Sequence, residues 1–325
     1  MNRIQKHSKA IVSVSIDVIA GVDIGGTNIS VGLITKTGEL LGHSEFPTEP
    51  AQGFESAVNK IASHITELIQ SDDYVLIGIG IGCTGRHNRA DGSLGNVEAF
   101  LPGWQSKNIT SAFHDKFNVP VTLENDADAA VIGEHTWGIG KGTSRFLLVT
   151  VGTGIGVGLS IDGQLYRGIE GAHPEIGHHI VDSSEGTVCW CGSQGCWEGL
   201  ASSGAMTDWW INNCSDAQDV KAMNAHEICR AAKMGNKCAI EAINRQGFYL
   251  GVGISNLMTL FAPDMIALGG GLMRSLDLFM DNIQKSIEIN CTLVPHHNTK
   301  VLPARFGTEA VLVGAASTLV TSDIC

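Results

Sequence analysis

The sequence lacks any apolar run that reaches the roughly 18 residues needed to span a bilayer. It is also short of positive charge, because 21 lysines and arginines stand against 33 aspartates and glutamates, for a net charge of −12. This balance argues against a nucleic-acid-binding surface and against binding to anionic membranes. Linkers of low complexity are missing too. We therefore expect a globular protein with neither a membrane nor a nucleic acid as its partner.

The N-terminal segment weakly resembles a secretory signal. Arg3, Lys6 and Lys9 precede an apolar run over residues 10–20, an order that is typical of signal peptides. Asp17 interrupts that run, and serines alternate with the apolar residues as they do in a strand. We therefore expect a short disordered tail that leads into a first strand.

The nine cysteines favour a metal site over a set of disulfides. Cys189, Cys191 and Cys196 fall within eight residues, and His178 and His179 lie just upstream. Three thiolates and one imidazole complete a closed tetrahedral zinc site with no position left for water. The alternative is three unrelated buried thiols, since free cysteine packs as a small hydrophobe. We expect a structural zinc and a cytoplasmic protein, because an odd number of cysteines fits a reducing compartment. The spacing alone leaves the choice of histidine open.

A strand, a glycine turn and a second strand occur twice. The first unit spans residues 20–35 around Asp23-Ile-Gly-Gly-Thr27, and the second spans 145–161 around Gly152-Thr-Gly-Ile-Gly156. Such turns let backbone N–H groups approach phosphate oxygens, and an acid beside them can hold Mg²⁺. Either turn alone could be a plain hairpin. Their repetition predicts a duplicated chain in which two phosphate loops face each other across a cleft.

Between the two units the sequence predicts alternating helices and strands. Apolar residues recur at helical spacing over 54–70, and a buried strand is expected over 75–81. Open α/β sheets bind ligands at the carboxyl ends of their strands, which here places the loop at 82–86 and Asp126 in candidate positions. Asp126 could equally serve as a helix N-cap. The remaining expected elements are strands over 40–46 and 120–123, a helix over 127–137, a hairpin at Asp162-Gly163, helices over 237–261, 276–289 and 309–320, and one strand over 265–268.

Five motifs occurring in one order resemble the ROK family of bacterial sugar kinases and related repressors. They are Asp23-Ile-Gly-Gly-Thr27, Glu124-Asn-Asp126, Gly152-Thr-Gly-Ile-Gly156, Glu175-Ile-Gly-His178 and the cysteine cluster at 189–196. The resemblance implies an α/β fold of the duplicated actin-like, hexokinase type with the active site between two domains. It implies an N-terminal domain over 18–124, to which a C-terminal helix over 309–325 returns, and a second domain over 125–308 that carries the zinc loop.

The resemblance also implies a role for each motif. Asp126 would be the catalytic base, and His178 would bind sugar and serve as the fourth zinc ligand. The implied sugar-binding residues are Gly85, Asn125, Asp126, Glu175, His178 and Glu198. The implied ATP and Mg²⁺ site comprises Asp23, Gly25, Gly26, Thr27, Asn28, Gly152, Thr153, Gly154, Gly156, Gly269 and Gly270, and the implied zinc ligands are His178, Cys189, Cys191 and Cys196.

The implied activity is ATP-dependent phosphorylation of a hexose, with glucose at its 6-hydroxyl as our first choice. N-acetylmannosamine, N-acetylglucosamine and fructose remain alternatives, because the chain departs from the family's usual pattern at 82–86, at Phe100 and at His173-Pro174. A sugar-binding regulator is the alternative outside enzymes; about 20 residues before the first glycine loop are too few for the winged helix-turn-helix of such repressors. The family also implies a homodimer or homotetramer.

Overall fold

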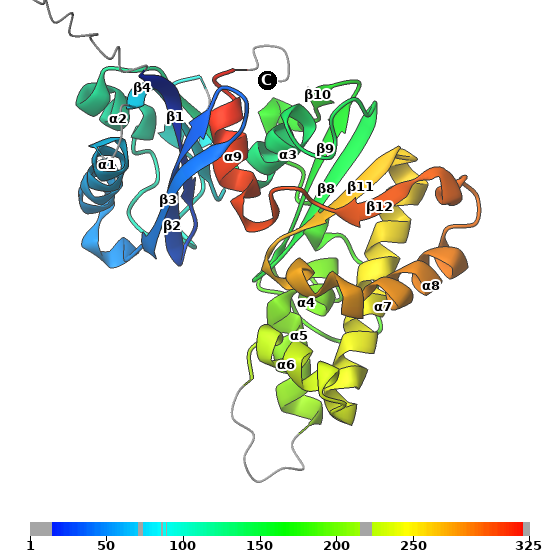
Figure 1. Ribbon diagram of the computed structural model, residues 1–325. Coiled ribbons are helices and arrows are strands. Elements are labelled where there is room, and N and C mark those ends of the chain that lie inside the picture. Colours follow the sequence, from blue (N-terminus) through cyan, green and yellow to red (C-terminus); the bar gives the residue numbers. More distant parts are fainter. Residues whose placement is uncertain (1–14, 71–73, 86, 89, 215–222, 321–325) are drawn as a thin grey trace, which may run out of the picture.

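Two five-stranded sheets form the framework of the computed structural model (Figure 1). The structure describes residues 15–70, 74–85, 87–88, 90–214 and 223–320. The expected N-terminal tail, the position of Arg86 and the final residues 321–325 lie outside these ranges. The proposed domain boundary between residues 124 and 125 stays a prediction.

The first sheet has the strand order β3-β2-β1-β4-β7. Its hairpin strands β1 and β2 are antiparallel, whereas β1, β4 and β7 run parallel. The carboxyl ends of three strands therefore meet at one edge of the sheet. The elements of this half are β1 (Ile16–Ile24), β2 (Asn28–Thr35), β3 (Leu40–Pro47), α1 (Phe54–Gln70), β4 (Tyr74–Cys83), β5 (His87–Asn88), β6 (Ser93–Leu94), α2 (Ile109–Phe117) and β7 (Val121–Asn125).

The second sheet repeats this plan in the order β10-β9-β8-β11-β12. Strand β8 (Arg145–Val151) is antiparallel to β9 (Ile155–Ile161) and parallel to β11 (Met265–Gly269). The turn after β9 has positive φ at Asp162 (51°) and Gly163 (80°), which is the backbone that the expected two-residue hairpin requires. It leads to β10 (Gln164–Leu165). The edge strand β12 (Lys300–Pro303) was not predicted.

Two helices lie between the sheets (Figure 1). Helix α3 (Asp126–Thr136) follows β7, and α9 (Ala310–Ser317) returns from the end of the chain to pack on β1, β4 and α3. This approach is so close that a Cβ at Gly80 would overlap the carbonyl oxygen of Ala315. A single added methyl group at that position would therefore push α9 away from the first sheet. The helix ends at Ser317, three residues before the predicted end.

The other face of the second sheet is covered by helices from the C-terminal half. The long helix α7 (Lys237–Phe261) has the predicted bounds. The expected helix at 276–289 is instead a 3₁₀ segment followed by a shorter α-helix. The remaining helices are α4 (Trp197–Ala201), α5 (Ser203–Asn213), α6 (Ala225–Lys233) and α8 (Met280–Asn290), with 3₁₀ turns at Pro50–Gln52, Ile169–Gly171, Ile176–His178, Gly271–Leu278, His296–Asn298 and Gly307–Glu309.

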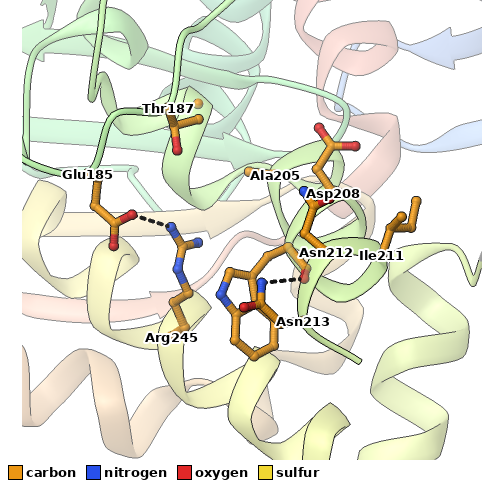
Figure 2. A pocket seen from close by; sticks show the side chains of 10 residues that line it. Glu185, Thr187, Ala205, Asp208, Ile211, Asn212, Asn213 and Arg245 are labelled. Carbon is orange, nitrogen blue, oxygen red and sulfur yellow. Dashed lines mark hydrogen bonds and ion pairs between the residues drawn. The ribbon is translucent and has the colours of Figure 1, made fainter. Parts of the chain in front are cut away.

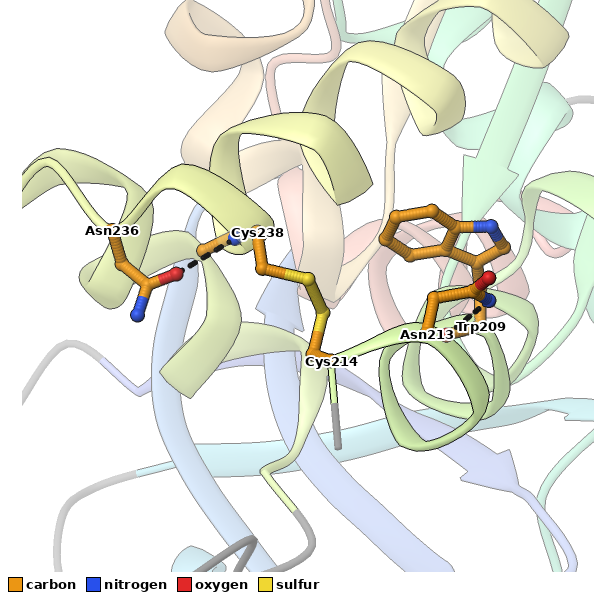
Figure 3. Close-up of a disulfide and its surroundings, with 6 residues drawn as sticks. Trp209, Asn213, Cys214, Asn236 and Cys238 are labelled. Carbon is orange, nitrogen blue, oxygen red and sulfur yellow. Dashed lines mark hydrogen bonds between the residues drawn. A yellow bond between two sulfur atoms is a disulfide. The ribbon is translucent and has the colours of Figure 1, made fainter. Parts of the chain in front are cut away.

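One disulfide corrects the expectation that the cysteines are reduced. Cys214, just after α5, bonds to Cys238 in the first turn of α7, with their Cα atoms 6.0 Å apart (Figure 3). The two cysteines are 24 residues apart in sequence, and packing of α5 beside α7 brings them together. Among the described helices, none combines the length and apolar character of a membrane span.

Candidate active site

Two acidic residues meet at the edge of the first sheet, near the carboxyl ends of two parallel strands. Asp23 in β1 is in register with Gly82 in β4, and Cys83 is in register with Asn125 at the end of β7. Asp126 follows at once as the first residue of α3. The strand register thus brings Asp23 and Asp126, which come from separate motifs, into one electrostatic cluster.

The pKa values of this cluster are shifted by burial. Burial raises the pKa of Asp126, while the Ala127 N–H and the nearby His173 and His87 partly oppose the rise. Burial also raises the pKa of Asp23 from 3.8 to about 7, and the negative charges of Asp126 and Glu45 add to the effect. Both carboxylates therefore bind a proton more readily than a solvent-exposed aspartate does. A cation bound at Asp23 would reverse its shift.

Asn125 fixes the turn that carries Asp126. Its Oδ1 accepts hydrogen bonds from the backbone N–H groups of Ala127 (2.9 Å) and Asp128 (3.2 Å), which makes it the N-cap of α3. Its Nδ2 donates to the carbonyl oxygen of Gly85 at 3.1 Å. Asn125 and Gly85, both predicted sugar ligands, are thus in contact. One N–H of the Asn125 amide remains for a ligand.

A network of four ionisable side chains near Asp126 could not be predicted from the sequence. Arg167 Nη2 lies 2.6 Å from Glu124 Oε2, and His173 Nδ1 lies 2.6 Å from Asp128 Oδ1. Both carboxylates are almost fully buried. The partners are 43 and 45 residues apart, so no local pattern could have revealed them. The network links the segment before Glu175 to the start of α3.

The first glycine loop is braced from the neighbouring strand end. The Thr48 hydroxyl donates to the Gly25 carbonyl oxygen at 2.7 Å, and the Thr48 N–H donates to the Thr27 carbonyl oxygen at 2.9 Å. Asn28 donates from Nδ2 to Glu45 Oε1 at 2.8 Å, so this amide is engaged by β3. Gly26 lies under Phe100, because a Cβ placed on it would be 3.3 Å from the Phe100 Cβ.

The second glycine loop and the glycines after β11 lie at one edge of the second sheet. Gly269 is in register with Thr150 near the end of β8. Gly270 has φ +87°, and a Cβ there would be 2.5 Å from the Val151 carbonyl oxygen, so only glycine fits. The loop is closed by a 2.9 Å hydrogen bond from the Gly152 N–H to the Gly154 carbonyl oxygen. These backbones form one glycine-lined edge, and the nucleotide-binding role that the resemblance implies for it stays a prediction.

Two further observations describe the rest of the second glycine loop. Thr153 is exposed at its tip. A Cβ on Gly156 would lie 3.4 Å from the Cβ of Ala127, the residue after Asp126. The second glycine loop is therefore adjacent to the helix start that carries the candidate base.

Glu198 connects the second glycine loop to the cysteine cluster. Its Oε2 accepts the Ile155 N–H at 2.8 Å, and its Oε1 accepts the Trp190 indole N–H at 2.5 Å. His178 Nε2 is 4.0 Å from the same Oε1. Glu175 is exposed and immediately precedes the 3₁₀ turn that holds His178. Glu198 and His178 are thus brought together, with Glu175 one turn away.

The predicted metal ligands converge. The ligand atoms of His178, Cys189, Cys191 and Cys196 all lie within 4.8 Å of one another. His178 Nδ1 is 3.7 Å from the Cys189 sulfur and 3.9 Å from the Cys196 sulfur. His179 is engaged elsewhere, since its two ring nitrogens lie 2.6 Å from the Ile176 carbonyl oxygen and 3.1 Å from Asn256 Nδ2. The donor set fits a tetrahedral ion that takes sulfur and nitrogen ligands.

A pocket of about 520 Å³ opens beside the cysteine cluster, and Thr187 and Gly199 are among its lining residues (Figure 2). Arg245 enters it from α7, and its Nη2 lies 3.6 Å from Glu185 Oε2. Asp208 and Trp209 contribute from α5. None of the predicted sugar or nucleotide residues lines this pocket, so it is separate from the candidate active site.

Comparisons with known proteins agree with this arrangement. A family model described as the ROK family matches residues 19–322. A glucokinase of Streptomyces coelicolor is 33% identical over 314 residues, which cover 91% of this chain and 95% of the relative. A xylose repressor of Bacillus spizizenii is 30% identical, covering 92% of this chain and 76% of the repressor. Kinases and repressors are therefore both among its relatives.

A solved structure shows the same fold. The crystal structure of a ROK family glucokinase from Streptomyces griseus, in complex with glucose and AMPPNP, superposes with a TM-score of 0.79 at 30% identity. The match covers 93% of this chain and 98% of that one. The expected α/β fold of the actin-like sugar-kinase type is confirmed.

Proposed function

The chain belongs to the ROK family, and from this premise we propose that it is an ATP-dependent kinase that phosphorylates glucose at the 6-hydroxyl. The observation that carries the proposal is Asp126, a partly buried carboxyl at the start of α3 whose pKa is raised by desolvation. It stands in one electrostatic cluster with Asp23 and next to the second glycine loop. Phosphoryl transfer requires a general base, a carboxylate that can hold a cation, and glycine-rich loops whose backbone can approach phosphates.

Asp126 would accept the proton from the attacking sugar hydroxyl. General bases work best when their pKa lies near the operating pH, and burial moves Asp126 in that direction. The backbone N–H of the next residue, Ala127, donates to Asp126 Oδ1 at 2.8 Å and holds the carboxylate in place. Protonated Asp126 would then release its proton to solvent or product.

The glycine loops would hold the phosphates of ATP. The N–H groups of Gly26 and Gly154 would supply donors for phosphate oxygens, and Gly270 would let the backbone come close to the nucleotide. The Gly25 N–H instead donates to the Asn28 carbonyl oxygen at 3.0 Å and would shape the loop around the phosphates. Asp23 would hold Mg²⁺, which neutralises phosphate charge when it is bound. Thr27, exposed at the tip of the first loop, adds a hydroxyl.

The sugar would lie against residues of both halves. Glu198, Glu175 and His178 accept or donate hydrogen bonds from one side, and Asn125 and Asp126 do so from the other. Zinc, held by His178 and the three cysteines, would fix the segment that presents His178 and Glu198 without acting on substrate. N-acetylmannosamine, N-acetylglucosamine and fructose are the competing substrates.

The second candidate function is a sugar-binding regulator, which the xylose repressor relative supports. The test is ATP consumption by the purified protein upon addition of single sugars. Sugar-dependent consumption supports a kinase, whereas sugar binding without ATP consumption supports the regulator.

We also propose a cytoplasmic homodimer or homotetramer, because intracellular ATP would be the phosphoryl donor and closed symmetric assemblies are the commonest oligomers. Light scattering should give at least twice the chain mass of 34.4 kDa. A 34.4 kDa particle at micromolar concentration would contradict the assembly and leave the kinase proposal unaffected.

A further inference from the structure

An aromatic contact joins the two halves of the chain beside the proposed sugar ligands. Phe100 lies in the segment between β6 and α2 of the first half, and Trp190 lies between two of the clustered cysteines in the second. Their rings meet edge to face, with centroids 5.6 Å apart and planes at 83°. Phe100 is 39% exposed and Trp190 is 66% exposed, so the pair is not part of either core.

Trp190 also donates a hydrogen bond to Glu198. Of the two Glu198 carboxylate oxygens, Oε2 accepts a hydrogen bond from the Ile155 N–H at 2.8 Å. Oε2 also packs against Gly154, so closely that a Cβ placed on this glycine would overlap the oxygen. Oε1 receives the Trp190 indole N–H at 2.5 Å. Because Cys189 Sγ and His178 Nε2 also lie 4.0 Å from Oε1, a sugar hydroxyl that bonds to this oxygen would take the place of the indole N–H.

Two neighbours hold the indole at this oxygen. The ring of His178 meets it edge to face at 5.1 Å and 84°, and Phe100 meets it from the opposite half of the chain. Phe100 is in turn backed by Gly26 of the first glycine loop. The position of the indole thus depends on contacts from both halves.

We propose that Phe100 and Trp190 form an aromatic gate, in which Trp190 occupies the sugar-binding oxygen of Glu198 until a sugar hydroxyl displaces it. This inference rests on the proposed role of Glu198 as a sugar ligand. The gate lowers sugar affinity, because only the fraction of molecules with Oε1 free can bind. Phe100 strengthens that effect by stabilising the closed position of the indole.

The test is calorimetric binding of glucose and the competing hexoses without ATP. Trp190→Phe keeps an aromatic ring but removes the N–H, so we expect the Kd to fall by about tenfold or more, because a hydrogen bond to a charged acceptor is stronger than one between neutral groups. Trp209→Phe, which alters a partly exposed tryptophan in the separate pocket, is the matched control and should leave the Kd unchanged. Zinc content measured in each variant confirms that the cysteine cluster is intact.

A double-mutant cycle tests the partnership. Phe100→Ala should tighten sugar binding when Trp190 is present and have little effect in the Trp190→Phe background, because the two changes act on one contact. The gate would be overturned if Trp190→Phe bound sugar no more tightly than the unaltered protein. It would also be overturned if neither the unaltered protein nor Trp190→Phe bound any of the sugars. Phe100→Ala acting equally in both backgrounds would overturn the coupling. These readouts are independent of ATP consumption, whose absence alone would refute only the kinase proposal.

Discussion

Replacing Asp126 by asparagine isolates the proposed base. Asparagine keeps an acceptor oxygen for the Ala127 N–H, which lies 2.8 Å from Asp126 Oδ1. The side chain hardly changes in size, but it can no longer take a proton. Loss of a general base typically costs about 10²- to 10⁴-fold in rate, which corresponds to about 3 to 5 kcal/mol in the activation free energy. We expect kcat to fall by this factor.

The same variant should not destabilise the fold. Burial raises the pKa of Asp126, which means that the folded chain disfavours the ionised carboxylate. Removing that charge relieves the cost, so the melting temperature at pH 8 should stay equal or rise. Sugar binding should be largely retained, because the amide preserves hydrogen-bonding capacity. A lower pKa of Asp23 is a further expected consequence, since Asp126 is one cause of its elevation.

The assay measures sugar-dependent ATP consumption, calorimetric sugar binding and thermal unfolding in parallel. Asp115→Asn is the matched control, because Asp115 is an exposed carboxylate in α2. A kcat of Asp126→Asn within tenfold of the unaltered protein would refute the assignment. Loss of activity together with loss of folding would instead indicate a structural role.

Three other predictions concern stability and metal content. The pKa of Asp23 is raised to about 7, so the folded chain binds more protons than the unfolded chain between pH 4 and 7; ligand-free stability in denaturant should therefore fall as pH rises through this window, and Asp23→Asn should flatten the profile. Elemental analysis should find one zinc per chain, and Cys196→Ser should lose it with a lower melting temperature; zinc-free protein that binds sugar normally would contradict the site. Removing the Cys214–Cys238 bond with Cys214→Ser should lower the free energy of unfolding by about 3 kcal/mol, and an unchanged unfolding midpoint without reductant would contradict the link.

The sequence predicted elements whose patterns are local and strong. Helix α7 and strand β8 have the expected bounds, and the repeated strand–glycine–strand units are the hairpins that begin each sheet. Strand β12 was missed because its four residues are largely exposed and carry no alternation, so only pairing with β11 makes them a strand. The short helices around the cysteine cluster were likewise not resolved by periodicity.

The candidate site likewise contains residues that could be predicted from the sequence and contacts that could not. Motif residues such as Asp23 and Asp126 could be proposed from their places at strand ends. Contacts between distant segments could not, because they depend on how helices and loops pack. The His173–Asp128 pair spans 45 residues, and the Phe100–Trp190 contact joins opposite halves of the chain. Residue types alone gave no reason to pair them.

The most direct test of the central claim is kcat/KM for glucose, mannose, fructose, N-acetylglucosamine and N-acetylmannosamine with ATP in excess. A site that bonds particular hydroxyls rejects sugars that lack them, so the values should separate clearly. We predict sugar-dependent ATP consumption with glucose as the best substrate. A tenfold higher value for another of these sugars would contradict the choice of glucose, and the absence of ATP consumption with all five would contradict the kinase.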